Sequence, residues 1–309
     1  MTLVLRRILA RLYRWSRDLR DFSAALAVAA VFHVIRLVPA EKAAGWGGFI
    51  ARKIGRMLPV SERVGMANLR RAFPHKDEAW HRAVLSECWD NLGRVAVEYC
   101  HLDHIWDLRP DDPAAGRIDI VGVEHFYALR DDNKPAIIIS AHLGNWELPM
   151  VAASAHGLEA AALFRAPNNR WIARWVYAQR KVTMGELIAS RHGSMHALSA
   201  VLERGVHLGM LTDQYFYAGV RSAFFGIETL NNQAFARLAR LHDCPVHAVR
   251  VVRLPGYRFR VELSEPLALP RDQNGRIDPA GAVDVMNRRF ESWISEYPGQ
   301  WLWLHRKWR

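Results

Sequence analysis

The sequence predicts an α/β fold with a mostly parallel central sheet flanked by helices, preceded by a helical segment that associates with a membrane. Three observations support this prediction. In the first 40 residues, arginines and apolar residues recur near helical spacing. Residues 41–116 carry the apolar spacing of packed helices. From residue 117 onward, short β-prone runs alternate with helical stretches, which is typical of a parallel sheet.

The basic N-terminus is the strongest indication of a membrane. Residues 1–20 contain six arginines and a single acid, Asp18. A basic amphipathic helix of this kind is typical of segments that lie on anionic lipid. A signal peptide or a core helix explains the arginines less well, since a signal peptide has only a short basic region and a core helix needs none. We therefore interpret residues 1–40 as a membrane anchor.

The apolar part of this anchor is short. The uncharged run over residues 22–32 has 11 residues, whereas a spanning helix needs about 20. The run becomes long enough only if Arg36 extends its guanidinium to the headgroups. Both flanks are basic, so charge does not orient the segment. A helix that lies on the membrane and one that spans it both remain open on sequence grounds.

Residues 41–309 are expected to form a single α/β domain with a helical lead-in over 41–116. Pro74 ends one predicted helix, and residues 77–102 show period-3.6 apolar spacing with an acidic first turn. We expect these helices to pack over the later sheet. The predicted strands are IDIVG (118–122), AIIIS (136–140), AALFRA (161–166), HLGMLTDQ (207–214), CPVHAVRVVRL (244–254) and RFRVELSEPL (258–267), and the last helix covers residues 279–296.

The composition narrows the possible partners. A net charge of +11 fits nucleic acid, an anionic membrane or an acidic protein. No zinc-ligand spacing, RNP-like aromatic motif or Walker loop is present, so we do not expect nucleic-acid binding, a metal or a cofactor. Cys88, Cys100 and Cys244 form no CxxC pair. They predict buried free thiols in a reducing compartment.

The stretch KPAIIISAHLGNWELPM (134–150) contains the candidate catalytic residues. We expect a strand to end at Ser140, Gly144 to supply a turn, and Asn145 to cap the next helix. The turn would let His142 meet Glu147, which would lie in the first helical turn. Glu147 would then hold one ring nitrogen, and the other could take a proton from an alcohol. The alternative is that His142 is a structural histidine near a helix start.

Several spaced motifs resemble the bacterial lipid A late acyltransferases, a family of lauroyl- and myristoyltransferases. AHLGNWEL (141–148) is similar to their Hxxxx(D/E) box, and NLRRAFP (68–74) is similar to their N-terminal segment. Further matches in the same order are FRAPNNRWI (164–172) with YAQRKVTMGELIASRHG (177–193), GVHLGMLTDQ (205–214) with FFG (224–226), and PGQWLWLHRKWR (298–309). Motifs in the right order over most of the chain are more specific than any single one.

This resemblance implies a glycerolipid-acyltransferase-like fold and an O-acyltransferase at the cytoplasmic face of the inner membrane. The family moves a fatty acyl chain from acyl-acyl carrier protein to a hydroxyl of a lipid A precursor. His142 would be the base and Glu147 its partner. The resemblance also implies that Arg165, Asn169 and Arg180 of the second block, and Asp213 and Gln214 of the third, bind substrate.

Three points remain open on sequence grounds. The segment IETLNNQAFARLAR (227–240) has Glu228, Asn231 and Asn232 where the family usually has small residues, which predicts an altered acyl or acceptor pocket. Trp301 and Trp303 in the tail suit either an interfacial or phosphate contact, or packing at a core edge.

The third open point is the reaction itself. The rivals to acylation of lipid A are acylation of a lysophospholipid or an amino-acid lipid, hydrolysis of a lipid or thioester through water activated by His142, and lipid binding without catalysis. Since no nucleophilic serine or cysteine is evident, we expect no acyl-enzyme.

Overall fold

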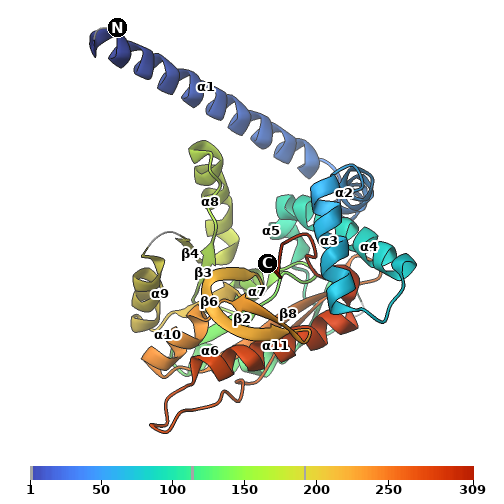
Figure 1. The fold of residues 1–309 in the computed structure, drawn as a ribbon, viewed down its shortest axis with the longest axis vertical. Coiled ribbons are helices and arrows are strands. Elements are labelled where there is room, and N and C mark those ends of the chain that lie inside the picture. The colour runs from blue at the N-terminus through green and yellow to red at the C-terminus, as the bar shows by residue number, and fades with distance from the viewer. Residues whose placement is uncertain (1–2, 113–114, 191–192) are drawn as a thin grey trace.

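The computed structural model describes residues 3–112, 115–190 and 193–309, and it confirms the predicted α/β fold (Figure 1). Seven strands form the central sheet in the order β1-β9-β8-β2-β5-β3-β4, and each neighbouring pair is parallel except β8 and β9. The strands are β1 (Ile118–Val121), β2 (Ile137–Ser140), β3 (Ala160–Phe164), β4 (Glu186–Ala189), β5 (His207–Leu211), β8 (Val246–Leu254) and β9 (Arg258–Leu263).

Each of the six predicted strands is present, and three further strands have no predicted counterpart. The four-residue β4 was not predicted, and neither was the antiparallel hairpin of β6 (Tyr215–Phe224) and β7 (Ile227–Asn231). Phe225 and Gly226 join these two strands with φ angles of 51° and 71°. Positive φ at both central residues is the geometry of a tight hairpin turn. Such turns usually have Asn, Asp or Gly at the first position, so Phe225 gave no turn signal in the sequence.

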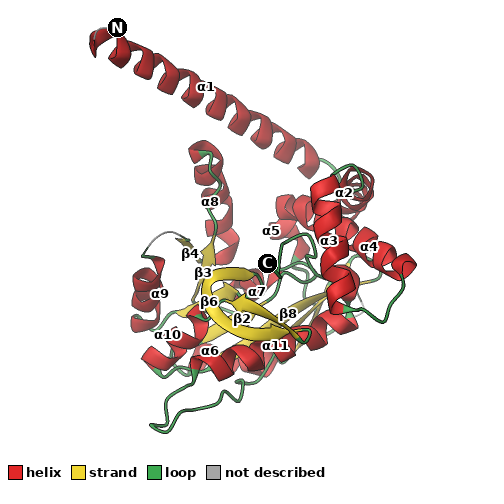
Figure 2. Cartoon of the chain, in the orientation of Figure 1, coloured by secondary structure: helices red, strands yellow, loops and turns green. Residues whose placement is uncertain are grey.

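Helices cover both faces of the sheet (Figure 2). Ile137 and Ile139 of β2 pack in one apolar cluster with α9, α10 and α11, while Ile138 packs in another with α6 and α7. This alternation explains why β2 is a continuous apolar run. The helices are α6 (Val123–Asp131), α7 (Leu148–Ala155), α8 (Arg170–Met184), α9 (Ser194–Glu203), α10 (Ala234–His242) and α11 (Pro279–Glu296).

The lead-in is helical, as predicted. Asp77 caps its longest helix by accepting from the backbone N–H of Trp80 at 2.7 Å. The preceding helix ends before Pro74, as expected for a residue without a backbone N–H. The elements are α2 (Ala40–Gly55), α3 (Pro59–Ala72), α4 (Glu78–Glu98), the 3-10 turn η1 (Tyr99–His101) and α5 (Leu102–Ile105).

The N-terminal segment forms one helix, α1 (Leu3–Arg36), that projects from the body of the molecule (Figure 1). Its C-terminal half contacts α8, with Phe32 edge-on to Trp175 at 4.6 Å between ring centroids. Arg36 at its end donates two hydrogen bonds to Asp103 at 2.8 and 2.7 Å. Among the described residues, no helix combines the length and apolar character needed to cross a bilayer.

The three cysteines confirm the prediction of buried free thiols. Burial raises the pKa of the Cys88 thiol to about 12, and those of Cys100 and Cys244 to about 11. Thiols with such raised pKa values are poor nucleophiles.

Candidate active site

The candidate site lies where two neighbouring parallel strands end. Ser140 at the end of β2 pairs with Leu211 at the end of β5. His142 and Asp213 each follow two residues later, so the sheet brings them together from positions 71 residues apart. Ligands in α/β proteins bind at the carboxyl ends of parallel strands. The site therefore occupies the edge of the sheet where this fold class places its ligands.

His142 and Asp213 form a hydrogen-bonded pair. Nδ1 of His142 lies 2.7 Å from Oδ1 of Asp213, and the backbone N–H of His142 donates to Oδ2 at 2.9 Å. Because a carboxylate faces Nδ1, the neutral ring carries its proton there and keeps the lone pair on Nε2. The amide nitrogen of Gln214 lies 3.4 Å from Nε2. Nε2 of His142 therefore lies on the Gln214 side of the ring and is the nitrogen able to accept a proton.

The electrostatics of this pair favour its charged form. Burial on its own would raise the pKa of the Asp213 carboxyl, but the charge and hydrogen bonds of His142, with a hydrogen bond from Trp301, lower that pKa to about 2. Burial on its own would lower the pKa of His142, yet the Asp213 carboxylate, with a smaller effect from Glu147, raises it above 6.5. An imidazolium formed by proton transfer is therefore stabilised.

Glu147 has a different hydrogen-bond partner from the one the sequence predicted. Its carboxylate oxygens accept from Nη2 of Arg180 at 2.7 and 2.8 Å, and Nε of Arg180 donates to the Tyr99 hydroxyl at 2.9 Å. Burial raises the pKa of Glu147, while the charges of Arg180 and His142 oppose that shift. The ring contact expected from Glu147 is made by Asp213, because β5 lies beside β2 and brings that carboxylate directly to Nδ1.

The turn after β2 has the predicted glycine geometry. Gly144 has a φ of +58°, and a Cβ there would lie 2.1 Å from the backbone oxygen of Val251. Asn145 accepts from the backbone N–H of Glu147 at 3.2 Å and donates to the buried Glu98 at 2.9 Å. Glu147 lies just before α7, which begins at Leu148, so the helix starts slightly later than predicted.

The C-terminal tail fixes Asp213. Trp301 donates its indole N–H to Oδ2 of Asp213 at 2.7 Å, and Lys307 donates to the backbone oxygen of Asp213 at 2.7 Å and to Asn231 at 2.8 Å. Lys307 is 1% exposed, and burial lowers its pKa to about 8. Trp301 and Trp303 are buried. Of the two hypotheses for these tryptophans, packing in the core is the one the structure confirms.

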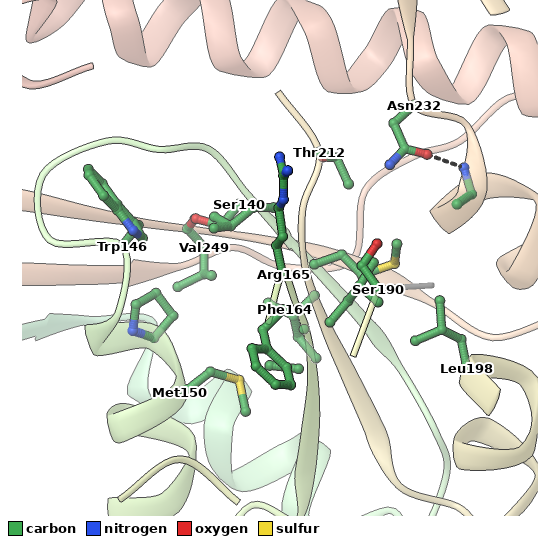
Figure 3. Close-up of a pocket in the computed structure, with 18 of the residues that line it drawn as sticks. Ser140, Trp146, Met150, Phe164, Arg165, Ser190, Leu198, Thr212, Asn232 and Val249 are labelled. Atoms are coloured by element: carbon green, nitrogen blue, oxygen red, sulfur yellow. Dashed lines mark hydrogen bonds between the residues drawn. The ribbon is translucent and has the colours of Figure 1, made fainter. Parts of the chain in front are cut away.

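A pocket of about 730 Å³ opens beside His142 (Figure 3). Much of its wall is apolar and includes Met150, Phe164 and Leu198. Gly209 of β5 widens this region, because a Cβ there would lie 3.0 Å from the sulfur of Met150. An apolar pocket with a few polar groups at one place is typical of a small-molecule or lipid site.

Five of the seven predicted site residues line this pocket: His142, Glu147, Arg165, Arg180 and Gln214. In Figure 3, the side chains of Phe164 and Arg165 extend in opposite directions, as expected for successive residues leaving β3.

The other two predicted residues have different positions. Asp213 lies behind His142 and is 1% exposed. Asn169 is not among the pocket residues: it accepts from the backbone N–H groups of Trp171 and Ile172 at the start of α8, and it donates to the backbone oxygen of Asp21 in α1 at 2.7 Å. Arg191 and His192 of the second motif block lie outside the described residues.

The unusual segment after FFG contributes four residues to the pocket wall: Asn232, Gln233, Ala234 and Arg237. Glu228 is exposed and pairs with Arg221 at 3.7 Å. Asn231 is buried and donates to the backbone oxygens of Ser222 and Thr229 within the hairpin. Asn232 alone of the three polar residues lines the pocket.

In the described ranges, no group of three or more His, Cys, Asp or Glu residues is placed to hold a metal ion.

Two features of the site have no clear signal in the sequence: the C-terminal tail that holds Asp213, and the role of Asp213 as the partner of His142. Trp301 and Lys307 belong to the motif at residues 298–309, but no local signal links them to Asp213. Tyr99 was not singled out at all. Its hydroxyl becomes part of the site through Arg180, 81 residues later.

Comparison with known proteins shows the family of this chain. The chain is 24% identical to the lipid A biosynthesis palmitoleoyltransferase of Escherichia coli K12 over 273 residues, which is 84% of each chain. It is 23% identical to the lipid A biosynthesis myristoyltransferase of the same organism over 82% of this chain and 77% of the relative. A lipid A biosynthesis acyltransferase of Haemophilus influenzae is 20% identical over 81% of this chain and 76% of the relative. The model of the family "Bacterial lipid A biosynthesis acyltransferase" matches residues 14–309, and the chain therefore belongs to this family of acyltransferases.

Proposed function

We propose that this enzyme transfers a fatty acyl chain from acyl-acyl carrier protein to a hydroxyl of a lipid A precursor, with His142 as general base. The observation that carries the proposal is the pairing of His142 with Asp213 beside a largely apolar pocket. In the proposed complex, the acyl chain occupies the pocket and its reactive end meets the acceptor beside Nε2 of His142. The fold and family membership support an acyltransferase; donor and acceptor are the proposed part.

The proposed reaction is a direct transfer. Nε2 of His142 takes the proton of the acceptor hydroxyl as its oxygen attacks the thioester carbonyl carbon. The carbonyl electrons move to oxygen and return as the carbon–sulfur bond breaks, and the imidazolium gives its proton to the departing thiolate. Asp213 stabilises the imidazolium without itself becoming protonated. No acyl-enzyme forms in this scheme.

Arg180 is the proposed donor to the developing oxyanion. Its Nε and Nη2 groups are held by Tyr99 and Glu147, and within the described part of the chain Nη1 has no hydrogen-bond partner. Arg180 lines the pocket, so Nη1 can donate to an oxygen that becomes charged. Glu147 then acts by positioning this guanidinium and by adding to the raised pKa of His142. Arg165 and Gln214 are the proposed contacts for polar parts of the substrates.

The proposed setting is the cytoplasmic face of the inner membrane, where an acidic acyl carrier protein and a phosphorylated lipid precursor would meet. A chain of net charge +11 suits both partners and an anionic bilayer. The segment over residues 1–40 is the proposed anchor, with α1 lying on the membrane.

The test is product analysis with matched variants. Lipid A from cells lacking this protein and complemented with wild type or His142→Ala would be compared by mass spectrometry. We expect His142→Ala and Glu147→Ala to lower transfer about 10²–10⁴-fold with the fold intact. His75→Ala, at an exposed position, is the control and should leave transfer unchanged. A folded His142→Ala enzyme with normal turnover would refute the mechanism.

Assays of the purified enzyme with and without each acceptor separate the rival reactions. Release of free fatty acid without acceptor would favour a hydrolase, and acylation of a lysophospholipid in place of the lipid A precursor would favour another acceptor. A covalent acyl-protein adduct trapped during turnover would contradict direct transfer.

A further inference from the structure

Helix α2 packs against the domain through its smallest residues. Gly47 lies so close to α4 that a Cβ there would be 2.6 Å from the backbone oxygen of Gly93. A Cβ on Gly93 would in turn be 2.2 Å from the backbone oxygen of Gly47 and 2.5 Å from Ala51. Gly48 and Gly55 belong to the same buried side. The two backbones therefore cross in direct contact, and small α2 residues occupy the crossing, while Arg52 pairs with Asp90 of α4 at 3.4 Å.

The large apolar side chains of α2 face the other way. We define the outward face as Trp46, Phe49, Ile50, Ile54 and Met57, which are between 51% and 77% exposed. At 100° per residue, its four helical members fall within an arc of about 140°, and the small packing residues centre on the opposite side. A helix at the surface of a globular protein normally buries its large apolar residues and exposes its polar ones. Helix α2 instead exposes its large apolar residues together with its polar ones, and its buried residues are all Ala or Gly.

The charges around this face are basic. Lys42, Lys53 and Arg56 fall within about 90° of its centre by the same helical arithmetic. Nζ of Lys53 lies over the ring of Phe49, 5.6 Å from its centroid. Glu41 is the one acid among residues 40–58. It falls about 150° from the centre of the face. Exposed aromatic and aliphatic side chains rimmed by lysine and arginine match an anionic lipid surface.

Helix α1 is held elsewhere and does not cover the outward face. Phe22 contacts Trp171 of α8 at 5.2 Å between ring centroids, and Arg170 of α8 pairs with Asp18 at 3.1 Å. Figure 1 shows α1 leaving the corner formed by α2 and running past α8. A second copy of this chain is a poor occupant as well, because it would bring two basic rims together.

We propose that the outward face of α2 lies on the surface of an anionic bilayer, as a membrane-docking site of the domain itself and separate from α1. The two sites together would hold the body of the enzyme against the bilayer at a fixed orientation. The inference uses no catalytic step, so it stands or falls separately from the proposed function.

The test uses a fluorescent label on the full-length protein. Cys88, Cys100 and Cys244 are buried, so Ile50→Cys provides a single exposed thiol for an environment-sensitive dye. Leu241→Cys on α10, which is 62% exposed, is the matched control. On phosphatidylglycerol-rich vesicles, the dye at position 50 should shift to shorter wavelength and be quenched by brominated acyl chains. Quenching should be greatest for bromines within about 5–10 Å of the headgroup boundary, the depth of an interfacial helix. The dye at position 241 should remain in water.

A charge variant tests the lipid preference. Lys42→Gln, Lys53→Gln and Arg56→Gln combined should weaken binding to anionic vesicles by up to about fivefold per charge, and leave binding to neutral vesicles unchanged. The proposal is overturned if the dye at position 50 remains in water on vesicles, or if the full-length protein does not bind anionic vesicles. A blue shift that appears without vesicles and grows with protein concentration would also overturn it, because that result indicates self-association.

Discussion

Replacing Asp213 by asparagine tests which carboxylate orients His142. The substitution keeps the size of the side chain and removes its charge, and it leaves Trp301 and Lys307 in place to hold the residue. Asparagine also presents an amide N–H group that can face Nδ1, which favours the wrong tautomer of the ring. We therefore expect a folded protein with a badly impaired base.

The size of the loss follows from the geometry. Nδ1 and Oδ1 are 2.7 Å apart. Two unit charges with centres about 4 Å apart attract by ~4 kcal/mol at an effective dielectric constant of about 20. Losing that stabilisation of the imidazolium in the transition state would slow transfer by about 10³-fold. The corresponding change in Ser-His-Asp triads lowers kcat by about 10⁴-fold. We expect a loss of about 10³–10⁴-fold in kcat.

The assay is transfer of a labelled acyl chain from acyl-acyl carrier protein to a lipid A precursor, measured against pH. The base must be neutral to act, so kcat/KM should rise as His142 loses its proton. For the wild type, the midpoint of this rise should lie above pH 6.5, because Asp213 raises the pKa of His142. Asp213→Asn should move the midpoint to lower pH. Asp119→Asn, which removes the partner of Arg260 at the sheet edge, is the control. It should change neither kcat nor the midpoint of the pH profile.

Glu147→Gln provides the contrasting result. Its hydrogen bonds go to Arg180, so it should lower kcat while shifting the midpoint less than Asp213→Asn does. The reasoning is refuted if folded Asp213→Asn retains near-normal kcat. It is also refuted if Glu147→Gln produces the larger shift of the midpoint, since that would make Glu147 the partner of the ring.

Three further outcomes follow from the structure. Gly144→Ala should lower the free energy of unfolding by at least about 1–3 kcal/mol in denaturant titrations, since a positive φ and a contact with Val251 oppose a Cβ; unchanged stability would contradict the turn geometry. Lys307→Met should lower stability by about 1–3 kcal/mol and lower kcat together, because it leaves the backbone oxygen of Asp213 without its donor; normal kcat would remove the tail from the site. Acyl-acyl carrier protein should lose apparent affinity as ionic strength rises and the Debye length falls from about 10 Å to about 3 Å, more steeply than acyl-coenzyme A; equal behaviour of both donors would favour a coenzyme A-dependent enzyme.

Local patterns were sufficient for most of the fold. Alternating apolar runs and helical stretches located six strands and the helix α11 with its observed limits. Pro74 and Asp77 marked helix boundaries by the chemistry of their own backbone and side chain. The hairpin of β6 and β7 escaped detection because Phe225 occupies a turn position at which glycine or asparagine is expected.

The sequence by itself determined that His142 lies between the end of a buried strand and a turn at Gly144, because strand propensity and a glycine's tolerance of positive φ are local properties. Only the tertiary structure decided which carboxylate meets that histidine. Glu147 is five positions away and pairs with Arg180, while Asp213 is 71 positions away and pairs with His142. The reason is strand order: β2 and β5 are neighbours in the sheet, and nothing local to either strand encodes that adjacency. Tertiary packing also decided that α2 turns Gly47, Gly48 and Gly55 toward the domain and leaves its large apolar residues outside, because contact between two backbones across Gly47 and Gly93 leaves no room for anything larger.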